Sequence, residues 1–173
     1  AAPFIGDDEA VAVLFGDDII AGKSPAIGQL IKTYEKYQDP VVGVIEVPKK
    51  ETASYGVIGG AKVDAKNWQV DKYVEKPKPA NAPSNMAAVG RYVITPEIIK
   101  ILHTQKPGKG GEIRLADAFA TLIKGGRTMY GCQFVGNRYD CGNKLQFIIA
   151  QIELGIKHPE VRSQLRAYLR NYL

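Results

Sequence analysis

Residues 11–18 read Val-Ala-Val-Leu-Phe-Gly-Asp-Asp, and this stretch decides the expected fold. Five consecutive apolar residues followed by glycine and two aspartates are typical of a strand that is buried on both faces. Such strands belong to parallel sheets that helices cover. The stretch therefore predicts an α/β fold with carboxylates at the C-terminal end of a central strand.

The following residues extend this pattern into a crossover unit. Ser24-Pro25 predicts a helix start with Ser24 as the N-cap, and apolar residues at helical spacing continue the helix to about residue 37. Residues 41–47 read as the next strand, so strand, helix and strand form one right-handed crossover. The remaining expected elements are antiparallel strands at 55–63 and 68–75, strands at 87–94 and 128–135, and helices after residues 95, 142 and 158, while residues 112–124 carry candidate buried positions.

Length and composition indicate a single globular domain over residues 1–173, because 45% of the residues are hydrophobic and 24% are charged. No apolar run approaches the roughly 20 residues that cross a bilayer, and the first residues lack the layout of a signal peptide. We therefore expect a cytoplasmic protein with no membrane partner.

The net charge of +5 is compatible with nucleic acid or with a small anion. Arginines near the C-terminus recur beside an apolar stripe, as in an ordinary amphipathic helix, and no basic stretch is rich in aromatic residues. We therefore expect no nucleic-acid partner. Cys132 and Cys141 fit no common zinc motif and read as ordinary buried thiols, while His103 and His158 read as surface or capping residues.

Acidic residues at strand ends are the first candidates for chemistry. Asp17 or Asp18 follows the central strand, and Asp140 follows a later strand and precedes Gly142. Two carboxylates with few other ligands suit Mg²⁺, which keeps several waters and shares its shell with phosphate oxygens. The alternative is that these aspartates only cap a turn or a helix.

Glu75-Lys76-Pro77 is the second candidate, because proline ends the expected strand beside two opposite charges. A carboxylate accepts hydrogen bonds from sugar hydroxyls while an ammonium neutralises a phosphate, so the pair suits a sugar phosphate. The alternative is an exposed glutamate and lysine before a loop.

Six motifs in register give these candidates a context. They are residues 15–20 (FGDDII), 55–58 (YGVI), 74–79 (VEKPKP), 82–92 (APSNMAAVGRY), 110–118 (GGEIRLADA) and 138–144 (RYDCGNK). In order and spacing this series resembles the family of bacterial UTP–glucose-1-phosphate uridylyltransferases, also called UDP-glucose pyrophosphorylases, over essentially the whole chain.

The resemblance implies a doubly wound, mostly parallel sheet of the nucleotide-diphospho-sugar transferase type, with a small antiparallel element and C-terminal helices. It implies that Asp17 and Asp140 bind Mg²⁺, that the Gly56 backbone lies against the sugar, that Glu75 holds the glucose hydroxyls and that Lys76 holds the phosphate. The strand that walls the sugar pocket is matched by Asn85, Ala88 and Tyr92. The implied catalytic groups are Asp17, Lys76 and Asp140, and the implied reaction converts UTP and glucose 1-phosphate to UDP-glucose and pyrophosphate.

The chain also departs from the family pattern. Family members begin with a strand and a glycine-rich loop that wraps the triphosphate, and no Gly-x-Gly-Thr-Arg run precedes residue 11 here. We therefore expect the C-terminal portion of a longer catalytic domain, inactive alone and prone to homo-oligomerise through an unpaired sheet edge. The alternatives are a module that only binds sugar phosphate or self-associates, and a relative that uses another sugar or nucleotide.

Overall fold

The computed structural model describes residues 1–108 and 110–172, which form two compact units. Unit 1 comprises Ala1–Phe15 and Gly22–Gly136, and unit 2 comprises Gly16–Ala21 and Asn137–Leu173. Compactness alone does not show that a unit folds independently, so the single domain over residues 1–173 stays a prediction. Among the described residues, no helix has the length and apolar character needed to cross a lipid bilayer.

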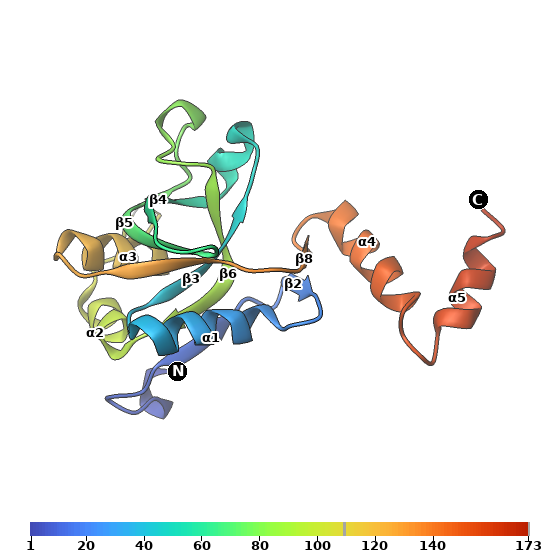
Figure 1. The fold of residues 1–173 in the computed structure, drawn as a ribbon, viewed down its shortest axis with the longest axis horizontal. Coiled ribbons are helices and arrows are strands. Elements are labelled where there is room, and N and C mark those ends of the chain that lie inside the picture. The colour runs from blue at the N-terminus through green and yellow to red at the C-terminus, as the bar shows by residue number, and fades with distance from the viewer. Residues whose placement is uncertain (109, 173) are drawn as a thin grey trace. The chain divides into compact units, whose positions relative to one another are not determined.

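Unit 1 is built on a six-stranded sheet in the order β1-β6-β3-β7-β5-β4, with a further pairing between β6 and β4 (Figure 1). Its strands are β1 (Val11–Leu14), β3 (Val41–Glu46), β4 (Gly56–Lys62), β5 (Asn67–Glu75), β6 (Met86–Ile94) and β7 (Met129–Gln133). The expected antiparallel pair at 55–63 and 68–75 is confirmed as β4 and β5.

The α/β class is confirmed, but the sheet is mixed, and the expected mostly parallel arrangement is not observed among the described residues. Strands β3 and β7 pair in parallel, whereas β6 pairs antiparallel with β1, β3 and β4, and β5 pairs antiparallel with β4 and β7. The cause is the position of β6 between β1 and β3. The two strands of the predicted crossover point the same way, but they are separated by a strand of opposite direction.

Strand β1 lies at the edge of the sheet and is not buried on both faces, which corrects the expectation from its apolar sequence. Its residues alternate between half-buried and exposed, and the side chains of Leu14 and Phe15 are 52% and 47% exposed. The long strand β6 is instead the one buried along its whole length. The continuous apolar run therefore predicted a strand of the sheet correctly, but the strand that is buried along its whole length is β6 and not β1.

Helices cover the sheet of unit 1 (Figure 1). Helix α1 (Ala26–Tyr37) contacts β1, β3, β6 and β7, while α3 (Leu115–Lys124) contacts β5 and α2 (Pro96–Thr104), and α2 also contacts β6. Phe119 of α3 is fully buried in the core together with Ala88 and Tyr92 of β6. Ser24 does not cap α1, because the cap position is Pro25 and no side chain bonds there.

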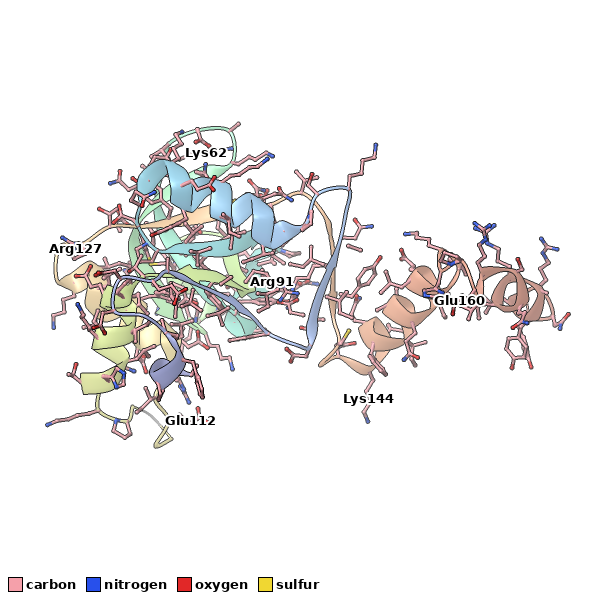
Figure 2. The ribbon with its side chains drawn as sticks, turned by 90° about the horizontal axis from the view of Figure 1, so that it is seen from below. Lys62, Arg91, Glu112, Arg127, Lys144 and Glu160 are labelled. Atoms are coloured by element: carbon pink, nitrogen blue, oxygen red, sulfur yellow. The ribbon has the colours of Figure 1, made fainter. Side chains whose placement is uncertain are left out.

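A buried arginine fixes the end of β1. The Nη1 atom of Arg91 donates hydrogen bonds to the backbone oxygens of Phe15, at 3.1 Å, and Gly90, at 2.7 Å. Arg91 lies inside unit 1, whereas Lys62 and Arg127 project from its surface (Figure 2). The Arg91 guanidinium therefore satisfies carbonyl groups where the strand ends.

Unit 2 contains a two-stranded antiparallel sheet that local sequence did not predict. Strand β2 (Asp18–Ala21) pairs with β8 (Asn137–Asp140), and helices α4 (Lys144–Gly155) and α5 (Arg162–Leu169) follow, with Lys144 at the start of α4 (Figure 2). The Tyr139 hydroxyl donates to Glu153 Oε2 at 2.8 Å and so ties β8 to α4. This hydrogen bond is the main reason that the pKa of Tyr139 lies above its usual value.

Candidate functional site

The predicted site residues fall into two groups, one in each unit. The acids Asp17 and Asp140 belong to unit 2, and the predicted sugar-phosphate residues belong to unit 1. Each group is described within its own unit.

Asp17 and Asp140 meet at Gly142. A Cβ atom placed on Gly142 would lie 3.1 Å from Asp140 Oδ1 and 3.6 Å from Asp17 Oδ2. The backbone around them is closed by hydrogen bonds, because the Cys141 amide donates to the Asp17 carbonyl at 2.7 Å and the Gly142 amide donates to Asp140 Oδ1 at 3.1 Å. One oxygen of each carboxylate therefore lies next to the side-chain position that Gly142 leaves vacant.

Asp18 has a different environment from its neighbour. Its side chain is 5% exposed, and Oδ1 accepts a hydrogen bond from Nε of Arg138 at 2.6 Å, whereas Asp17 is exposed. The Nη2 atom of Arg138 also lies 3.4 Å from Asp140 Oδ2. Of the two adjacent aspartates, Asp17 is thus the one whose carboxylate remains accessible to a ligand.

Asp140 is not the cap of the following helix. The N-cap of α4 is Asn143, whose Oδ1 accepts hydrogen bonds from the amides of Leu145 and Gln146 at 3.0 and 3.1 Å. Because Asn143 satisfies the helix terminus, the carboxylate of Asp140 is left for the turn at Gly142.

The donor set at Gly142 fits a magnesium ion. Within residues 1–108 and 110–172, no group of three or more His, Cys, Asp or Glu side chains is placed to hold a metal. Mg²⁺ is usually bound by one or two carboxylates, with water and phosphate oxygens completing its shell, whereas zinc sites need three or four protein ligands. Two carboxylates beside one vacant side-chain position match the first case.

In unit 1, Gly56 and Glu75 are brought together by the β4–β5 ladder, in which they are direct partners. Lys76 follows at a corner, where its φ of 46° lies in the left-handed region and its amide donates to the Tyr55 carbonyl at 2.9 Å. The side chains of Glu75 and Lys76 are both exposed. We call Gly56, Glu75 and Lys76 the acceptor corner.

Tyr73 is a neighbour of this corner that sequence reasoning missed. It lies two residues before Glu75 and therefore on the same face of β5. The space where a Cβ atom of Gly56 would point is filled by the Tyr73 hydroxyl, with Tyr73 Cζ 2.7 Å from that position. Burial is the main cause that raises the pKa of Tyr73 well above its usual range, so its hydroxyl stays protonated. The period-2 spacing from Glu75 was the signal available.

The three predicted wall residues do not share one location. Val57 pairs with Ala87, which places Ala88 beside Gly56, and the Tyr92 ring contacts Phe119 with ring centroids 5.7 Å apart. Ala88 and Tyr92 are both 7% exposed and belong to the core.

Asn85 lies apart from this core, beside a cleft of about 720 Å³ that Glu46 and Lys49 also line. Its Nδ2 donates to Glu46 Oε1 at 2.8 Å. The structure therefore groups Ala88 with the acceptor corner and places Asn85 in a neighbouring cleft.

Both cysteines are free thiols; Cys132 is buried, while Cys141 is only half-buried. Burial raises the pKa of Cys132. No disulfide framework exists among the described residues.

Comparison with known proteins gives consistent results. The family model described as nucleotidyl transferase matches residues 1–155. A UTP–glucose-1-phosphate uridylyltransferase of Staphylococcus epidermidis is 45% identical over 170 residues, which cover 98% of this chain and 58% of the relative. The enzyme of the same name from Bacillus subtilis is 43% identical over 173 residues, covering 100% of this chain and 59% of the relative.

Solved structures agree. A crystal structure of UDP-glucose pyrophosphorylase complexed with UDP-glucose matches with a TM-score of 0.83 at 37% identity, covering 90% of this chain and 59% of that chain. A UTP-bound UGPase from Acinetobacter baumannii matches with a TM-score of 0.79 at 28% identity, covering 94% and 56%. The chain thus spans less than two thirds of the length of these relatives. It belongs to the nucleotidyl transferase family.

Proposed function

We propose that this chain supplies the sugar-phosphate pocket and the metal acids for uridylyl transfer from UTP to glucose 1-phosphate, which gives UDP-glucose and pyrophosphate. The names of the relatives at 43–45% identity support this reaction. The observation that carries the proposal is the acceptor corner, where the β4–β5 pairing sets Glu75 against Gly56 and the backbone turns at Lys76.

In the proposed reaction, a phosphate oxygen of glucose 1-phosphate attacks the α-phosphorus of UTP. The bond from that phosphorus to the bridging oxygen breaks, and pyrophosphate leaves with the electron pair. Transfers of this kind depend on alignment and on charge neutralisation. The Lys76 ammonium offsets the charge of the attacking phosphate, while Glu75 orients the sugar by accepting hydrogen bonds from its hydroxyls.

Asp17 and Asp140 are the residues that would hold Mg²⁺. When bound, the ion neutralises phosphate charge. Arg138 contributes by position, because its contacts with Asp18 and Asp140 fix the strand pair that carries the acids.

Binding of glucose 1-phosphate to the 173-residue chain, measured by calorimetry, tests the acceptor role. Glu75→Gln should weaken binding about tenfold, because a hydrogen bond to a charged group is worth about 1.5–3 kcal/mol, and Lys76→Ala should weaken it more. Lys72→Ala is the matched control, since Lys72 is an exposed lysine of the same strand. Unchanged binding in both site variants would contradict the assigned roles.

Turnover separates a complete enzyme from a sugar-phosphate-binding module. The 173 residues contain no Gly-x-Gly-Thr-Arg run. We expect no pyrophosphate when UTP, glucose 1-phosphate and Mg²⁺ are added to this polypeptide, while glucose 1-phosphate still binds. Release of pyrophosphate would refute the proposal that this polypeptide supplies only the sugar-phosphate pocket and the metal acids. Faster release with TTP than with UTP would favour another nucleotide.

Homo-oligomerisation is supported by exposed apolar side chains within each unit. Leu14 and Phe15 lie at the end of the edge strand of unit 1, and Leu145 and Ile148 of α4 are 64% and 53% exposed. Large exposed apolar side chains gathered on one element are typical of an interaction surface. The cytoplasmic location stays a prediction.

A further inference from the structure

A second cavity of unit 1 lies beside α1, away from the acceptor corner. It has a volume of about 850 Å³ and is bounded by the first half of α1, the turn before β5 and the end of β7. None of Gly56, Glu75 and Lys76 lines it. Its size falls within the range of small-molecule sites.

The charge around this cavity has one sign. Lys23, Lys32 and Lys66 line it, and no aspartate or glutamate does. In the part of the chain that the structure describes, none of these three lysines takes part in an ion pair. By contrast Lys36, one turn along α1 from Lys32, is paired with an aspartate at 2.9 Å. Three ammonium groups around one hollow repel each other and attract an anion, and the neighbouring carboxylate of Asp64 is already paired with Lys36.

The residues of the cavity floor are buried and uncharged, and the carboxylate next to them, Asp64, accepts a hydrogen bond from Asn67 Nδ2 at 2.9 Å. Thr33 is 4% exposed and donates from Oγ1 to Oδ1 of Asn67, which is 8% exposed, at 2.9 Å. Cys132 is 1% exposed, and burial raises its pKa, so the thiol stays neutral. Gln29 fixes one wall by exchanging two hydrogen bonds of 2.9 Å with the backbone of Val135. These hydrogen bonds tie α1 to the start of β5 and to the residues that follow β7.

Helix α1 adds a favourable field and an open surface. Its first turn contains no acidic residue and its N-cap position makes no side-chain hydrogen bond. Gly28 lines the cavity, and a Cβ atom placed on it would meet no atom within 4 Å. The positive end of the helix dipole therefore adds to the lysine charges at a surface that a ligand can approach.

We propose that this cavity binds a small phosphate-bearing anion, at a site lined by none of the residues of the acceptor corner. The lysines supply charge-assisted hydrogen bonds, and the Thr33, Asn67 and Cys132 floor sets the depth of entry. The proposal does not depend on uridylyl transfer, because it uses none of the residues assigned to that reaction.

Calorimetric titration of the full chain with inorganic pyrophosphate tests the proposal. A parallel titration uses inorganic phosphate, which carries less charge. We expect pyrophosphate to bind more tightly than phosphate. Replacing Lys23, Lys32 and Lys66 together by alanine should weaken binding at least about tenfold, as loss of one or more charge-assisted bonds predicts. The control replaces three other exposed lysines, Lys72, Lys106 and Lys124, which changes net charge equally and should alter affinity less than about twofold.

Gly28 offers a second test that leaves the fold intact, because its Cβ position is open and other residues favour helix over glycine. Gly28→Glu should weaken pyrophosphate binding about tenfold, whereas Gly28→Gln, of the same size, should bind more tightly than Gly28→Glu. Absence of pyrophosphate binding at millimolar concentration overturns the proposal. An equal loss of pyrophosphate affinity in both triple-lysine variants also overturns it. Loss of binding in Lys76→Ala overturns it as well, because that result would place the anion at the acceptor corner.

Discussion

Asp17 and Asp18 are adjacent in sequence, yet the structure predicts opposite consequences for their replacement. Asp18 is buried against Arg138, so Asp18→Asn removes the charge from the 2.6 Å partner of a half-buried guanidinium, which keeps only its longer contact with Asp140 among the ion pairs described above. Breaking a buried pair from one side costs about 3 kcal/mol or more in the free energy of unfolding. Asp17 is exposed and shares its open space with another carboxylate, so Asp17→Asn should change stability by less than about 0.5 kcal/mol.

Metal binding should show the reverse order. Asp17→Asn removes one of the two carboxylates that face Gly142 and should weaken Mg²⁺ binding at least about tenfold. Asp18→Asn leaves both carboxylates in place and should retain most of the affinity at temperatures where unit 2 is folded. Chemical unfolding followed by circular dichroism and Mg²⁺ titration by calorimetry measure the two quantities on the same samples. Equal loss of Mg²⁺ affinity in both variants, with Asp18→Asn as stable as the parent, would refute the assignment.

Three further predictions concern unit 1. Gly56→Ala should lower the free energy of unfolding by about 1–3 kcal/mol, because the new methyl group overlaps the Tyr73 ring, and adding Tyr73→Val should recover part of it in thermal unfolding. Hydrogen bonds hold the pKa of Asp64 well below its usual range, and the one from the Asn67 side chain contributes most. The stabilisation of the fold by the ionised Asp64 carboxylate is therefore present above about pH 4 and is lost as the pH falls. Asp64→Asn should therefore flatten acid destabilisation below that pH, and an unchanged slope would contradict the linkage. Light scattering should detect oligomers that Leu14→Lys, on the exposed edge strand, reduces; a monomeric parent chain would rule this out.

Local patterns in the sequence were sufficient for the long elements. Helical spacing found α1 and α4, and alternation found β4 and β5, because each of these elements repeats its apolar positions over several turns or pleats. Pro77 likewise marked the end of β5, but Glu75 and Lys76 by themselves indicated only a possible sugar-phosphate site, and Gly56 was implied by the family resemblance alone. The order and direction of strands were not accessible in this way. The position of β6 between β1 and β3 depends on contacts between distant segments, which carry no local signal.

The acids illustrate the same limit within the candidate site. Sequence left open whether Asp17 or Asp18 faces a ligand, because the answer depends on Arg138, which lies 120 residues away from Asp18. Strands β2 and β8 have four residues each and are defined only by pairing with each other. Tyr73 was missed because its role against Gly56 follows from packing across two strands and not from a motif.

The pairing of β2 with β8 has a consequence for the order in which the chain assembles. Unit 2 is made from two segments separated by nearly the whole of unit 1, so the acids at Gly142 meet only when a very long loop closes. Contacts of such sequence separation form slowly, after local hairpins and helices. During synthesis, Asp17 emerges long before Asp140 has been made. The acceptor corner can thus take shape on the nascent chain while the two acids are still apart, and the proposed binding of Mg²⁺ would then occur only after β2 and β8 have paired.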